Sequence, residues 1–126
     1  MRIALSLALV LTAVPAAAQD WRGAPEYDVL LTTYDIVPKE IRLKAGIPVR
    51  LRFVNNSNQK LSFSAGGFFR SAQLRQRDKG AADGTIEVAA LSSETVVLVP
   101  KAGRYKMRGR TFVHRMLGMD GRIVVE

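Results

Sequence analysis

Gly103–Glu126, with the sequence GRYKMRGRTFVHRMLGMDGRIVVE, indicates the fold of this chain more clearly than any other stretch. Its two ends have the alternating and β-branched residues of strands, and a loop separates them. The loop contains His114, the only histidine of the protein, and Met119 follows five residues later. No cysteine occurs anywhere in the 126 residues. The stretch predicts a strand, a loop with two potential metal ligands, and a closing strand.

Residues 1–18 have the pattern of a secretory signal peptide. Arg2 supplies a positive start, residues 3–14 form an almost unbroken apolar run, and Ala16-Ala17-Ala18 is a small-residue cleavage site. Cleavage after Ala18 would leave a mature chain that starts at Gln19, which predicts a periplasmic protein. The apolar run is too short to span a bilayer by itself, although an uncleaved anchor is the alternative. We expect no transmembrane segment in the mature chain.

The chain is basic, with 19 Lys and Arg residues against 11 Asp and Glu residues and a formal net charge of +8. This balance favours an acidic protein partner or another anionic ligand. Nucleic acid is not expected as the physiological partner of an exported protein, although non-specific binding at low salt follows from the charge. A basic surface without a special partner is the alternative. The sequence indicates no particular oligomeric state.

Short alternating segments predict an all-β fold. Val49–Val54 is the clearest case, because Val49, Leu51 and Phe53 would point to one side and the intervening arginines to the other. Turn signals recur about every eight to twelve residues, which predicts a Greek-key β-sandwich or barrel of about seven or eight strands. The lack of cysteine means that packing alone must stabilise this domain.

The segments also suggest how the chain is organised. Residues 19–35 are expected to form an N-terminal arm and a first strand at 27–34, and residues 36–126 the main domain. Residues 71–77 are predicted as a short helix, and residues 78–84 as a polar loop. The remaining strands are expected within these ranges: 36–44, 49–54, 61–65, 85–89, 94–99, 104–108 and 121–126.

The order of these segments resembles the cupredoxin family. Residues 38–46 (PKEIRLKAG) and 49–56 (VRLRFVNN) are similar to the paired strands that open a bacterial cupredoxin. Residues 100–105 (PKAGRY) are similar to the entry of its ligand strand, and residues 118–125 (GMDGRIVV) fit its Gly-Met-x-Gly-x-Ile-x-Val ending. The resemblance covers residues 36–126 and implies a cupredoxin fold.

The resemblance also implies a degenerate type 1 copper site, which normally needs one cysteine, two histidines and a weak axial methionine. His114 falls on the second histidine position and Met119 on the methionine position. Gly109, five residues before His114, occupies the cysteine position, and Leu61, two residues before Phe63, occupies the first histidine position. We therefore expect Leu61 to fill the vacated space near Phe63 and Met119, with His114 at the surface.

Binding of Cu(I) without a thiolate is an alternative, because thioether and imidazole groups suit this ion. The ligands would be His114, Met119 and Met116. Met107 is in phase with Tyr105 on its predicted strand and is expected to fill the core. Copper is thus a possible cofactor, and Cu(I) fits the remaining residues better than a type 1 centre does.

Arginines surround the former ligand positions. Arg108, Arg110 and Arg115 flank them in the closing stretch, and Arg70 lies in the segment after the Leu61 strand. In a cupredoxin both segments would meet near one end of the barrel, where guanidinium groups suit carboxylates and acidic protein surfaces. A solvated basic face is the alternative. Ordinary solvation is expected for a second basic set on the outward face of two strands: Arg42, Lys44, Arg50 and Arg52.

These observations predict a non-enzymatic, exported cupredoxin-like binding or accessory protein. The resemblance implies that it serves a metal-uptake or respiratory system. The alternative is a Cu(I) chaperone or store that uses His114 and Met119. Electron transfer through a type 1 centre is disfavoured because the thiolate ligand is absent. An enzyme is not expected, since the sequence has no recognisable catalytic triad and no phosphate-binding loop.

Overall fold

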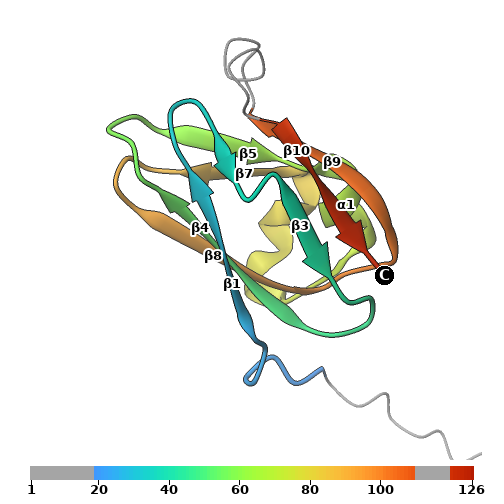
Figure 1. Cartoon of the computed structure of the whole chain (residues 1–126). Helices are drawn as coiled ribbons and strands as arrows, with labels where there is room; N and C mark the ends of the chain where they lie inside the picture. Colours follow the sequence, from blue (N-terminus) through green and yellow to red (C-terminus); the bar gives the residue numbers. More distant parts are fainter. Residues whose placement is uncertain (1–18, 110–119) are drawn as a thin grey trace, which may run out of the picture.

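Two five-stranded sheets pack face to face in this chain, as its computed structural model shows for residues 19–109 and 120–126 (Figure 1). The first sheet has the strand order β2-β1-β4-β8-β6, and the second has the order β3-β10-β9-β5-β7. Strand β1 pairs with β4, and β10 with β3, in parallel fashion, and the other pairs are antiparallel. The predicted all-β sandwich is confirmed.

The chain passes repeatedly from one sheet to the other, which is the Greek-key way of connecting a sandwich. The first sheet contains β1 (Glu26–Leu31), β2 (Ile36–Val37), β4 (Val49–Asn55), β6 (Gln73–Leu74) and β8 (Ser93–Val99). The second sheet contains β3 (Glu40–Leu43), β5 (Leu61–Ser64), β7 (Thr85–Val88), β9 (Gly103–Gly109) and β10 (Asp120–Val125). The described ranges thus hold more strands than predicted, because β2 and β6 are too short to give a periodic pattern.

Aromatic side chains join the two sheets across the core. Phe53 of β4 and Phe63 of β5 are both buried, and their ring centroids lie 4.7 Å apart. Phe69 packs edge-on against Phe63 at 6.1 Å and against Phe53 at 6.4 Å. Strand β4 buries every second residue, as its sequence alternation predicts. The hydrophobic effect of these large side chains is what holds the sandwich together without disulfides.

The first helix, α1 (Gly66–Ser71), lies earlier in the chain than predicted. Phe68 and Phe69 are fully buried, so packing into the core outweighs the poor helix propensity of the two leading glycines. The prediction of a helix at 71–77 is wrong, because Leu74 of β6 pairs with Leu98 of β8 instead. Residues 78–84 are not a plain loop either: the 3-10 helix η1 covers Gln76–Asp83.

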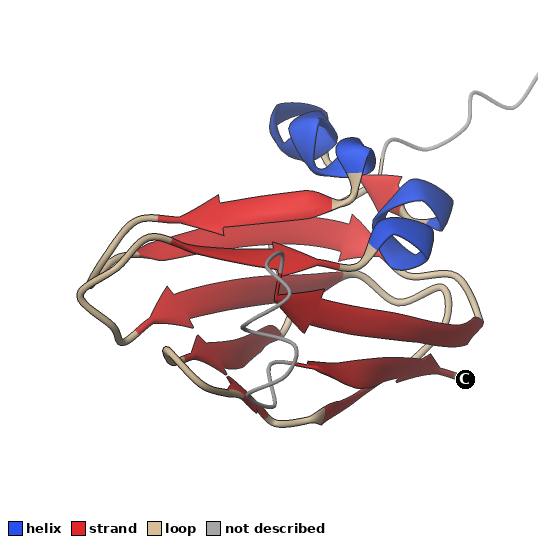
Figure 2. Cartoon of the chain, turned by 90° about the horizontal axis from the view of Figure 1, so that it is seen from above, coloured by secondary structure: helices blue, strands red, loops and turns tan. Residues whose placement is uncertain are grey.

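Figure 2 shows the helical segments gathered at one side of the strand layers. Arg75 and Asp78 hold η1 in place, since their side chains form an ion pair of 2.8 Å. The Asp78 carboxylate also accepts a hydrogen bond from the backbone of Val97 in β8. No helix within residues 19–109 and 120–126 combines the length and apolar character needed to cross a membrane.

A buried asparagine fixes the turn between β4 and β5. The Asn55 amide donates to the carbonyls of Gln59 (2.7 Å) and Val88 (3.0 Å), and its oxygen accepts from the backbone and hydroxyl of Ser57. All of its hydrogen-bonding capacity is therefore used, as burial of a polar side chain requires. The turn sets where β5 begins, and so places Leu61 opposite Val88 of β7.

Candidate functional site

Leu61 and Gly109, the two positions where the resemblance to cupredoxins implies lost copper ligands, lie together on the inner face of the second sheet. Gly109 at the end of β9 is buried and is the register partner of Phe63 in β5. Leu61 is buried on the same face of β5, two residues before Phe63. Leu61 and Gly109 are consequently diagonal neighbours, about 7–8 Å apart in such a ladder. The structure thus brings these two positions together, with the Phe63 ring beside them.

The other predicted ligands lie outside the described residues. These are His114, Met116 and Met119, together with the flanking Arg110 and Arg115. We also expect Leu61 and Phe63 to contact Met119, and His114 to be exposed. Both expectations concern residues 110–119, which lie outside the described residues, so they stay predictions. Met107 is described, and only 1% of its surface is exposed, so its predicted role as a core residue is confirmed.

The described residues do not fit a type 1 copper centre. Neither the side chain of Leu61 nor Gly109 offers an atom that can bind a metal, and such a centre depends on a thiolate and an imidazole at these places. Across residues 19–109 and 120–126, no three or more His, Cys, Asp or Glu side chains gather in a way that could hold a metal ion.

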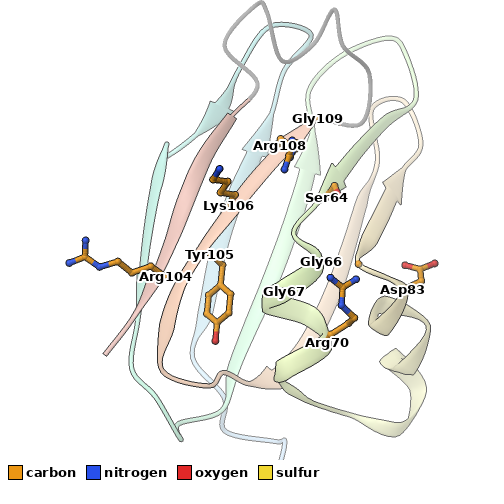
Figure 3. Close-up of a pocket in the computed structure, with 11 residues that line it drawn as sticks. Ser64, Gly66, Gly67, Arg70, Asp83, Arg104, Tyr105, Lys106, Arg108 and Gly109 are labelled. Atoms are coloured by element: carbon orange, nitrogen blue, oxygen red, sulfur yellow. The ribbon is translucent and has the colours of Figure 1, made fainter.

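A basic pocket of about 580 Å³ opens on the outer side of the same strands (Figure 3). Strands β5 and β9, helix α1 and the turn after η1 surround it. Its basic side chains are Arg70 from α1 and Arg104, Lys106 and Arg108 from β9, and all four are exposed. The remaining lining residues are Ser64, Gly66, Gly67, Asp83, Gly84, Tyr105 and Gly109.

Glycines let Arg70 lie close to the pocket floor. A Cβ on Gly66 would come within 2.8 Å of Arg70 Nη2 and 2.9 Å of Nη1. Gly84 has a φ of +99°, and a Cβ there would meet the Cα of Gly66 at 2.8 Å. A side chain at either position would therefore collide with its neighbour, and glycine is the residue that tolerates such a positive φ. In Figure 3 the guanidinium of Arg70 lies next to Gly66, whereas Arg104 extends away from it.

The four cations of the basic pocket make no salt bridge with any residue in the part of the chain that the structure describes. Asp83 is the one carboxylate in the lining, and one of its oxygens accepts a hydrogen bond of 2.9 Å from the backbone of Thr85. Asp120, the first residue of β10, is the register partner of Arg108 but forms no ion pair with it. Among the residues that the structure describes, the lining of the pocket thus has four cations and one carboxylate, an excess of positive charge.

Two residues of this pocket, Arg70 and Arg108, are predicted from the sequence, and the structure places them in one lining. The sequence prediction misses Arg104 and Lys106 as site residues. The alternation of β9 could have revealed them, because inward Tyr105 and Met107 require their neighbours to point outward together. Arg52, in the second basic set, is within 3.8 Å of Glu26 and 3.6 Å of Asp28, as expected for a solvated face.

Comparisons with known proteins identify the fold. No protein-family model matches the sequence, and no curated protein matches it. The structure is similar to auracyanin B, with a TM-score of 0.58 and 20% identity over 82% of this chain and 89% of that one. It is also similar to dithionite-reduced auracyanin from the photosynthetic bacterium Roseiflexus castenholzii, with a TM-score of 0.58 and 15% identity over 82% of this chain and 99% of that one.

A larger protein contains the same arrangement. McoA, a multicopper oxidase from the hyperthermophile Aquifex aeolicus, matches with a TM-score of 0.66 and 17% identity. The match covers 86% of this chain and 31% of the oxidase chain, so the similarity is to one part of that enzyme. Identities this low reveal architecture and not activity. With its two sheets, their strand order and these structural neighbours, the chain has a cupredoxin-like fold.

Proposed function

We propose that this chain is an exported, non-enzymatic cupredoxin-like protein that binds an acidic partner protein through its basic pocket. The observation that carries the proposal is the set of four exposed cations, Arg70, Arg104, Lys106 and Arg108, that no carboxylate of the described residues neutralises. Arginine binds carboxylates through paired hydrogen bonds, and a patch of one charge accelerates association with an oppositely charged surface.

The position of the pocket supports this function. Three of its cations come from one strand, β9, which pairs with β10 along residues 103–108 and with β5 at Arg108 and Gly109. A charged surface on a paired strand is held in place before binding, so little conformational entropy is lost when a partner arrives. We propose that the partner belongs to a metal-uptake or respiratory system. Only the resemblance to cupredoxins supports this part of the proposal.

A cross-linking experiment in the native host tests the proposal. A photo-reactive residue in place of Lys106 should capture an acidic partner when the full chain is expressed. Capture should disappear when Arg104 and Arg108 are changed to glutamate, and should persist when Arg50, on the outer face of the other sheet, is changed to glutamate. Equal capture by both reversed-charge variants would contradict a role of the basic pocket.

Export is tested by determining the N-terminus of the mature protein. We propose cleavage after Ala18, so the purified protein should begin at Gln19, and it should appear in the periplasmic fraction. A chain that still begins at residue 1 and sediments with membranes would support the uncleaved anchor instead.

Binding of Cu(I) is the second candidate, because His114, Met116 and Met119 are soft ligands within a short stretch. A competition titration with a Cu(I) chelator under reducing conditions tests it. Submicromolar binding that is lost in the His114→Ala variant would favour a copper chaperone or store. Binding weaker than about micromolar, about −8 kcal/mol, and unaffected by that substitution would end this alternative.

A further inference from the structure

We infer that the basic pocket holds one carboxylate of an acidic peptide segment between Arg70 and Arg108, and that Gly66 positions Arg70 for this contact. The inference rests on the proposed function and makes it specific: the partner would present a glutamate or aspartate side chain. A general attraction between charged surfaces would need the net charge alone, whereas a pocket for one carboxylate needs these two guanidinium groups in defined places.

Arg70 is the better defined of the two. A Cβ on Gly66 would lie 2.8–2.9 Å from its Nη atoms, and a Cβ on Gly84 would lie 3.6 Å from Nη1. The side chain folds back over its own helix towards the turn after η1 (Figure 3). Glycine at both positions therefore leaves the room that the guanidinium occupies beside the pocket lining.

Arg108 lies on the other side, across the end of β5. It is the register partner of Ser64, so the Cβ atoms of this pair are about 4.5–5.5 Å apart. The Ser64 hydroxyl is half-buried and makes no hydrogen bond to any residue in the described ranges. The pocket thus has a hydroxyl donor and two guanidinium forks in one lining, a donor set that suits the two oxygens of a carboxylate.

The lining of the pocket carries four cations and one carboxylate, Asp83, so it attracts an anionic side chain. The pocket is also open along β9, where Lys106 continues the row of cations beyond Arg108. This shape suits a carboxylate carried on an extended acidic segment, with a neighbouring acidic residue near Lys106.

The test uses the full mature chain and a fluorescein-labelled hexaglutamate peptide, with binding followed by fluorescence anisotropy at low and physiological salt. The Gly66→Ala variant keeps every charge but places a methyl group 2.8 Å from the Arg70 Nη2, so the guanidinium must shift, and we expect affinity to fall about threefold. Its matched control is Gly80→Ala in η1, outside the pocket lining, where an added Cβ would have nothing within 4 Å. Thermal melting shows that both variants fold.

A second pair of variants separates the pocket from net charge. Arg70→Gln should weaken binding about five- to tenfold, as for loss of a charge-assisted hydrogen bond. Arg50→Gln removes the same charge from the other sheet and should change affinity less than about twofold because of screening. Free acetate should displace the peptide at high concentration, whereas chloride at the same ionic strength should displace it less, because chloride cannot pair with a guanidinium through two oxygens.

The outcomes distinguish this inference from the proposed function. Loss of affinity on changing Lys106 and Arg104 to glutamine, with no effect of Gly66→Ala and Arg70→Gln, would overturn the carboxylate pocket and leave the docking surface standing. Equal weakening by Arg50→Gln and Arg70→Gln would overturn both. Equal displacement by acetate and chloride, or no peptide binding at low salt, would overturn the assignment of a carboxylate ligand.

Discussion

The two faces of β9 have opposite chemistry. On the inner face Met107 and Gly109 are buried against the core, in the place where the sequence resemblance suggests copper chemistry. On the outer face three cations follow each other along the strand: Arg104, Lys106 and Arg108. The inner residues of β9 thus keep a role in packing the core. The side chains of the same strand that are available for binding lie on its outer face.

The largest expected effect comes from cutting back the inner face. Replacing Met107 by alanine should lower the free energy of unfolding by about 2–5 kcal/mol, because it leaves a cavity beside buried neighbours. The matched outer-face change, Lys106→Ala, should alter it by less than about 0.5 kcal/mol, as for most exposed positions. Chemical denaturation of the two variants measures both values. Similar losses for both would show that the two faces are not divided in this way.

The second prediction asks whether the inner face still has the geometry of a ligand site. The double variant Leu61→His, Gly109→Cys supplies the two side chains that a type 1 set lacks. Buried polar atoms without partners should cost about 1–3 kcal/mol each in the apo form. With Cu(II) added, we expect strong visible absorption from a copper–thiolate bond. The same variant with His114→Ala is the control and should lack that absorption.

Failure to develop the absorption in the double variant would contradict the residue-by-residue correspondence that the resemblance implies. Stability without copper provides an independent readout. If both substitutions were neutral in the apo protein, Leu61 and Gly109 would not be as tightly surrounded as their burial indicates.

Much of the fold is predictable from periodicity, because β4 and β9 alternate between a buried and a wet face. Only the structure explains why the second glycine of the Gly-Met-x-Gly ending, Gly121, cannot be replaced by a larger residue. Gly121 has no room for a side chain, since a Cβ there would collide with the Lys39 carbonyl and lie 2.6 Å from the Met107 Cε. Sequence patterns misplace helix α1 because the burial of Phe68 and Phe69 stabilises it. The helix propensities of single residues do not include this tertiary contribution.

The candidate site is less predictable than the fold. The sequence suggests that Arg70 and Arg108 lie near each other, but it gives no way of telling which other cations are neutralised. Arg75, directly before η1, forms an ion pair with Asp78, whereas Arg70 forms none within the described ranges. Such pairing depends on backbone geometry and on contacts between distant strands, so composition alone overstates the free positive charge.

A smaller effect is expected where the two faces meet, at Tyr105. Its hydroxyl donates to the carbonyl of Lys101 at 2.8 Å and lies 3.2 Å from the Ser71 hydroxyl, so it ties β9 to α1. Changing Tyr105 to phenylalanine keeps the ring contact with Phe68 and should lower the free energy of unfolding by about 1 kcal/mol. Ser71→Ala should cost less, since it leaves the bond to Lys101. A loss from Ser71→Ala as large as that from Tyr105→Phe would contradict this order.

The smallest effect concerns an arginine that is paired, on β10 beside the cations of β9. The Arg122 guanidinium donates to Glu40 at 2.8 Å and, with a lesser contribution from Arg42 at 3.2 Å, holds the pKa of Glu40 below its ordinary value. Because the pKa is lowered on folding, the stabilisation is present above the unfolded pKa and is lost as pH falls through the folded one. Arg122→Gln should raise this pKa towards the ordinary value, Arg42→Gln should raise it less, and Lys106→Gln should leave it unchanged. A carboxyl-carbon NMR titration measures the pKa of Glu40 in all three variants. If Lys106→Gln raised this pKa as much as Arg122→Gln does, Glu40 would also neutralise the row of cations on β9. That result would weaken the case for a free anion pocket there.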